Sequence, residues 1–116
     1  MKDNIEFLDY LEDIINAMGN IEKFTREMDF DDFKEDDKTI FAVIRALEII
    51  GEAAKRIPQS VRDKYPKIPW REMAGMRDKM IHEYSGVDLK IVWDTVEQDN
   101  PVLKPQLEKI LEDLQE

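Results

Sequence analysis

Residues 40–54 read IFAVIRALEIIGEAA, and this stretch decides the fold class. Its apolar side chains recur at three- and four-residue spacing, as on one face of an α-helix. The apolar positions are Ile40, Val43, Ile44, Leu47, Ile50 and Ala54. Arg45, Glu48 and Glu52 share the opposite face at spacings that allow ion pairing. We therefore predict a long helix over roughly residues 37–57.

The same helical periodicity continues on the N-terminal side of this stretch. Apolar residues predict a first helix from about residue 3 to the mid-twenties. They are Ile5, Leu8, Leu11, Ile14, Ile15, Met18 and Ile21. Gly19 weakens this helix by about 1 kcal/mol relative to alanine but need not end it. Residues 28–37 are acidic and predict a connector with one short turn of helix.

On the C-terminal side, proline residues mark where the next elements begin. Residues 60–65 predict one or two helical turns. A third main helix is predicted to start near Pro69 and Trp70, because proline is favoured at the first position of a helix. We expect this helix to run towards His82.

The last third of the chain predicts two further helices. Asp88 can cap one of them. Asn100 and Pro101 look like a cap-plus-proline start of the final helix, although Pro105 could delay that start to residue 105. No strand-like alternation, repeat or low-complexity tract interrupts the pattern. Residues 1–116 are therefore predicted to form a single all-α domain, an antiparallel up-and-down helical bundle of four to five main helices.

Composition narrows the class of protein further. The 116 residues fit one domain with a modest core, and they include no cysteine and one histidine. Thiolate metal sites and a two-histidine zinc site within one chain are thereby excluded. No apolar run approaches the ~20 residues that span a bilayer, and the N-terminus lacks the apolar core of a signal peptide. We expect a soluble cytoplasmic protein.

Charge is unevenly distributed along the chain. The formal net charge of −10 argues against broad, nonspecific binding of nucleic acid. Residues 55–90 nevertheless carry 9 Lys/Arg and 5 Asp/Glu, whereas the segments before and after them are acidic. A small basic site in an acidic body could bind one phosphate, although ordinary variation of surface charge explains the pattern equally well.

The basic segment contains the run Arg77-Asp78-Lys79-Met80-Ile81-His82-Glu83-Tyr84. On a helical wheel that starts at Trp70, Arg77 falls near the centre of the apolar arc. A guanidinium keeps its proton, so on a buried face it needs a carboxylate, a phosphate or an interface to satisfy its donors. Arg77 is therefore a candidate site residue, and His82 is the only histidine of the chain.

Simpler interpretations of these residues stay open at this point. Arg77 could form an ion pair with Glu48 or Glu52. His82 could face solvent at a helix end, where its cation meets the helix dipole favourably. Tyr84 could pack at the edge of the core. On an ideal helix Arg77 and His82 would point about 140° apart, so the spacing alone does not define a site.

Three segments together resemble a known family. Arg77 and His82-Glu83-Tyr84 match the R-x4-H-x-Y motif of the HepT-like toxins, a branch of the HEPN superfamily. Residues 47–55, LEIIGEAAK, look like the second-helix signature of that family. Residues 68–72, IPWRE, followed by Gly75-Met76-Arg77, look like its approach to the active site. The resemblance covers nearly the whole chain.

The resemblance implies a fold, an activity and partners. HEPN proteins are all-α bundles that usually act as metal-independent ribonucleases, and they commonly dimerise so that two Arg–His motifs face one cleft. HepT-like members are toxins of HEPN/MNT toxin–antitoxin systems, paired with an MNT-type nucleotidyltransferase antitoxin that adenylylates the motif tyrosine. By this resemblance Arg77 and His82 would be catalytic, Asp78 supporting and Tyr84 the adenylylation site, with RNA as substrate and no cofactor.

The chemistry of RNA cleavage agrees with a dimeric site. Cleavage without a metal uses the 2′-hydroxyl as nucleophile and benefits from a base, an acid and a cation. One chain supplies one histidine, whereas a twofold homodimer would supply two histidines and two arginines. Two alternatives remain, namely a catalytically inactive HEPN module that binds nucleotides or RNA as a partner subunit, and a purely structural bundle without a site.

Overall fold

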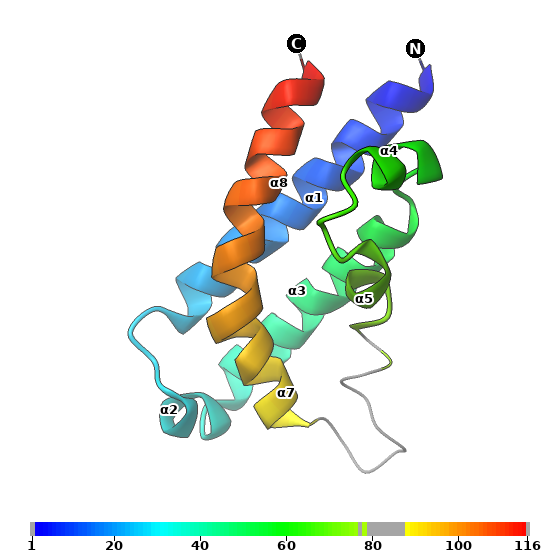
Figure 1. Cartoon of the computed structure of the whole chain (residues 1–116). Helices are drawn as coiled ribbons and strands as arrows, with labels where there is room; N and C mark the ends of the chain where they lie inside the picture. Colours follow the sequence, from blue (N-terminus) through cyan, green and yellow to red (C-terminus); the bar gives the residue numbers. More distant parts are fainter. Residues whose placement is uncertain (1, 77, 79–87, 116) are drawn as a thin grey trace.

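The structure of the chain, a computed structural model, describes residues 2–76, 78 and 88–115. These residues form helices joined by short connectors, and no strand occurs among them. Three helices are long, namely α1 (Lys2–Thr25), α3 (Asp37–Lys55) and α8 (Asn100–Gln115). The predicted all-α helical bundle is confirmed. Figure 1 shows α1 antiparallel to both α3 and α8, with the two chain ends at the same end of the bundle.

The N-terminal half follows the predicted pattern closely. Helix α1 continues through Gly19 and ends at Thr25. The acidic connector holds one short helix, α2 (Phe30–Lys34), whose N-cap Asp29 accepts a hydrogen bond from the Asp32 backbone N–H. Asp36 caps α3 by accepting from the backbone N–H of Thr39. Side-chain caps thus satisfy backbone donors that a helix start leaves unpaired.

The segment after α3 is folded into two short helices, α4 (Gln59–Lys64) and α5 (Trp70–Ala74). The expected start at Trp70 is confirmed, but the helix is interrupted on its way towards His82. Met76 and Asp78 are helical again, and residues 79–87 lie outside the described part of the chain. Helix α5 ends at Ala74, and Gly75 is its C-cap. Glycine favours helix ends because it carries no side chain and adds backbone freedom. The helical wheel drawn from Trp70 therefore does not apply beyond this point.

The C-terminal third forms one nearly continuous rod, coloured from yellow to red in Figure 1. Helix α7 (Leu89–Asp94) leads into a π-helical turn, η1 (Thr95–Asp99), which leads into α8. Asn100 and Pro101 therefore do not start an independent helix, and the delay to Pro105 does not occur. Pro105 lies inside α8, where its missing N–H costs the helix one internal hydrogen bond.

Asn100 has a different role from the predicted cap. Its side chain is 2% exposed, and its amide donates a hydrogen bond of 3.1 Å to the backbone carbonyl of Met18 in α1. The wider π-turn before it changes the phase of the helix, because each π-turn accommodates an extra residue. Asn100 thus joins the C-terminal rod to α1 near the middle of the bundle.

One apolar core lies between the long helices. The side chains with the least exposure come from α1, α2, α3, α7 and α8: Leu11, Ile14, Ile21, Phe33, Val43, Leu47, Val92 and Leu107. Phe33 of α2 contacts Trp93 of α7 at 5.1 Å between ring centroids, so even the short helix is anchored. Across residues 2–76, 78 and 88–115, no helix is both long and apolar enough to cross a membrane.

Candidate active site

The residues predicted to form the site fall mostly outside the described part of the chain. Arg77, His82 and Tyr84 are not described, and neither is the alternative ion pair of Arg77 with Glu48 or Glu52. Asp78 is helical and exposed to solvent. What the structure does show is how the elements on both sides of residues 79–87 are held.

On the N-terminal side, α5 is fixed by a buried tryptophan and a close approach to α3. Trp70 is 4% exposed, and its indole N–H donates to the backbone carbonyl of Tyr65 at 3.0 Å. A Cβ placed on Gly51 of α3 would lie 3.4 Å from the Met73 carbonyl oxygen and 3.5 Å from that of Ala74. Position 51 can therefore carry only a small residue while α5 keeps this distance from α3.

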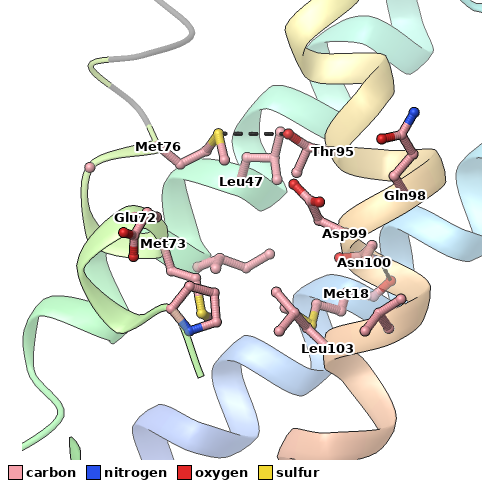
Figure 2. Close-up of a pocket in the computed structure, with 14 residues that line it drawn as sticks. Met18, Leu47, Glu72, Met73, Met76, Thr95, Gln98, Asp99, Asn100 and Leu103 are labelled. Atoms are coloured by element: carbon pink, nitrogen blue, oxygen red, sulfur yellow. Dashed lines mark hydrogen bonds between the residues drawn. The ribbon is translucent and has the colours of Figure 1, made fainter. Parts of the chain in front are cut away.

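On the C-terminal side, Asp88 caps α7, as predicted. Its carboxylate accepts hydrogen bonds from the backbone N–H groups of Lys90 and Ile91 at 3.1 and 3.2 Å. The two sides also meet directly, because the Thr95 hydroxyl lies 3.8 Å from the sulfur of Met76. The residue before Arg77 is therefore held against the junction of α7 and η1 (Figure 2).

A pocket of about 490 Å³ opens beside this contact, between α5 on one side and η1 and α8 on the other (Figure 2). Its floor comes from α1 and α3. The apolar lining consists of Met18, Leu47, Ile50, Pro69, Met73, Met76, Val102 and Leu103, and the polar lining includes Glu72, Thr95, Gln98, Asp99 and Asn100. A pocket of this size could accommodate a small molecule or apolar side chains of a partner.

The charge of this pocket decides against a role in binding phosphate. Glu72 and Asp99 contribute carboxylates from opposite sides, and Figure 2 shows the Asp99 carboxylate directed into the gap. Two carboxylates in one pocket would repel an RNA phosphate. The pocket was not predicted from the sequence, because its lining comes from four separate segments. Within the described residues, no group of three or more metal-binding side chains is arranged to hold a metal ion.

The all-α bundle, with an Arg–His run inserted between α5 and α7, defines the class of protein as a HEPN-like helical bundle. Comparison with known proteins then gives the family. Residues 14–110 match the family described as Ribonuclease HepT-like, and the chain belongs to this family. The membership confirms the predicted family and, with it, the enzyme class, ribonuclease.

Curated relatives agree with the family match over most of their length. The chain is 61% identical over 102 residues to the "Probable ribonuclease HepT" of Thermococcus cleftensis. The aligned residues make up 88% of this chain and 93% of the relative. It is 50% identical over 107 residues to the "Putative RNase MJ0125" of Methanocaldococcus jannaschii, covering 92% of both chains. No solved structure matches the chain significantly.

Proposed function

We propose that this chain is a metal-independent endoribonuclease and the toxin of a HEPN/MNT-type toxin–antitoxin pair. The observation that carries the proposal is the family match over residues 14–110, which includes the whole run from Arg77 to Tyr84. The fold supports it, because α5 and α7 hold the two sides of this run on a packed bundle. A rigid scaffold favours catalysis because it limits the motion of the groups it carries.

The proposed reaction uses two copies of the chain. His82 of one protomer removes the proton of the RNA 2′-hydroxyl, and the 2′-oxygen attacks the adjacent phosphorus. The partner's His82 gives a proton to the 5′-oxygen as the P–O5′ bond breaks. Arg77 stabilises the negative charge of the phosphorane. The products are a 2′,3′-cyclic phosphate and a 5′-hydroxyl, so every proton and bond is accounted for without a cofactor.

Replacement of the histidine tests this reaction. His82→Ala should lower the rate of RNA cleavage by ~10²–10⁴-fold, the usual cost of losing one acid–base group, and should relieve growth inhibition on expression. Far-ultraviolet circular dichroism should show unchanged helical content. Arg26→Ala is the control, since this exposed arginine lies outside the motif. Full cleavage by purified His82→Ala protein would refute the assigned role.

Metal independence is tested separately. Cleavage by the wild-type protein should continue in excess chelator, with products that end in a cyclic phosphate. If chelator stops the reaction and magnesium restores it, the proposed mechanism is wrong. A protein that binds RNA or nucleotides but cleaves no RNA in either condition would indicate the inactive partner subunit instead.

A further inference from the structure

The corner of the molecule formed by the end of α4, the connector to α5 and the start of α5 is basic. Residues 55–71 carry six Lys/Arg and one Asp, in a chain whose net charge is −10. Lys64, Lys67 and Arg71 of this stretch are all exposed. We call these three residues the basic corner.

Among the described residues, the basic corner gathers three exposed cations within eight positions, and none of the three forms an ion pair. Ion pairs join carboxylates to five other basic residues: Lys34, Arg45, Lys90, Lys104 and Lys109. No such pair involves Lys64, Lys67 or Arg71 within the described part of the chain. In so acidic a protein, cations left together without counter-charges repel one another and create a local positive potential.

Hydrogen bonds of the local fold order the backbone that carries these cations. The Tyr65 carbonyl accepts both the Trp70 indole N–H at 3.0 Å and the Ile68 backbone N–H at 3.2 Å, which turns the connector tightly. Buried Ile68 and Trp70 anchor the turn in the core. The three cations therefore project from an ordered part of the surface.

The acidic groups closest in sequence are directed elsewhere. Asp63, the only carboxylate among residues 55–71, accepts a hydrogen bond of 2.8 Å from the Gln59 side chain. Glu72 lines the pocket between α5 and α8. Neither forms an ion pair with the basic corner, so its cations remain available to an external anion.

We propose that the basic corner binds the phosphate backbone of the RNA substrate and guides the strand along α5 towards the catalytic run. The proposal rests on the proposed ribonuclease function. Arg71 begins the approach, because α5 leads from it towards Arg77 along the chain. Half-buried Tyr65, with the Lys64 ammonium 5.7 Å from its ring centroid, adds an aromatic group beside the cations. Cations beside an aromatic ring suit single-stranded RNA, whose phosphates and bases are both accessible.

A charge-matched pair of variants tests the proposal. The corner variant combines Lys64→Gln, Lys67→Gln and Arg71→Gln. The control variant combines Lys23→Gln, Arg26→Gln and Lys38→Gln, which remove the same charge from exposed positions elsewhere. Binding of a fluorescent single-stranded RNA is measured by anisotropy in the uncleaving His82→Ala background, over a range of salt concentrations.

The corner variant should bind this RNA roughly tenfold or more weakly than the control. Its plot of log affinity against log salt should be shallower by about 2, since each phosphate contact on a single strand contributes about 0.7. In the active background, KM for long RNA should rise while kcat stays near that of the control. Cleavage of a dinucleotide, which has a single internucleotide phosphate, should be equal in the two variants.

Equal RNA affinity and equal salt slope in the two variants would overturn the proposal. So would a corner variant that keeps its RNA affinity but no longer binds polyglutamate, since the surface would then serve an acidic protein. The binding measurement needs no cleavage, so it decides the role of the corner separately. If instead the proposed catalytic function is wrong, RNA cleavage will not depend on His82.

Discussion

At the scale of single residues, a few small or polar side chains decide how the helices meet. Gly51 permits the close approach of α5 to α3. Asn100 connects α8 to α1 through a buried hydrogen bond between residues 82 positions apart. Apolar periodicity selects helix faces, but such contacts determine where one helix lies along its neighbour.

Asn100 gives a first prediction at this scale. Asn100→Ala should lower the free energy of unfolding by ~1–3 kcal/mol, because a buried hydrogen bond is lost. Asn100→Asp should cost more at neutral pH, since a buried carboxylate would face the Met18 carbonyl oxygen without a proton to donate. Urea denaturation measures both. Gln106→Ala is the control, because Gln106 makes a similar bond to the Val102 carbonyl on the exposed surface.

Tyr84 gives a second prediction, which follows from the proposed function. Co-expression with a cognate MNT-type nucleotidyltransferase should add AMP to its hydroxyl and stop RNA cleavage. Tyr84 lies seven residues after Arg77 in the sequence. The phosphate of the added AMP would be negatively charged and would compete with the substrate phosphate for Arg77. Peptide mass spectrometry locates the modification, and Tyr84→Phe should lack it. A neutralised toxin with unmodified Tyr84 would show that the antitoxin acts by another route.

At the scale of elements, the short helix α5 matters because it leads directly into the proposed catalytic run. It has only five residues, so propensity alone cannot hold it. Its position depends on Trp70, on its packing against α3 and on the contact between Met76 and Thr95. A change that moves α5 should therefore affect activity even when it touches no catalytic residue.

The side chain at position 51 tests this dependence. Gly51→Ala places a methyl group in ordinary van der Waals contact with α5, and its better helix propensity should offset the contact, so stability should change by less than about 1 kcal/mol. Gly51→Leu should push α5 away, at a cost of ~1–3 kcal/mol, and should also reduce RNA cleavage. Thermal unfolding and cleavage assays report the two effects. Full activity of a folded Gly51→Leu protein would contradict the coupling.

At the scale of the whole molecule, an acidic helical bundle carries the basic corner where the connector joins α4 to α5. An acidic body repels RNA at long range, so productive binding should be confined to the few positive surfaces. The proposed site is also incomplete in one chain, which has a single histidine for two proton transfers.

Dimerisation is the prediction at this scale. Sedimentation at micromolar concentration should give about twice the 13.7 kDa chain mass. Mixing His82→Ala with Arg77→Ala protein should not restore cleavage, because each heterodimer keeps one His82 and the proposed reaction uses two. A monomer that cleaves RNA at full rate would rule out the composite site.

The sequence by itself determined the all-α class, the long helices, the α7 cap at Asp88 and the family. These follow from local spacing and short motifs, because helix faces and caps depend on residues only a few positions apart. Only the tertiary structure decided that Asn100 turns inwards and that four segments enclose a pocket. Each of these depends on contacts between residues far apart in sequence, whose geometry exists only once the helices have packed.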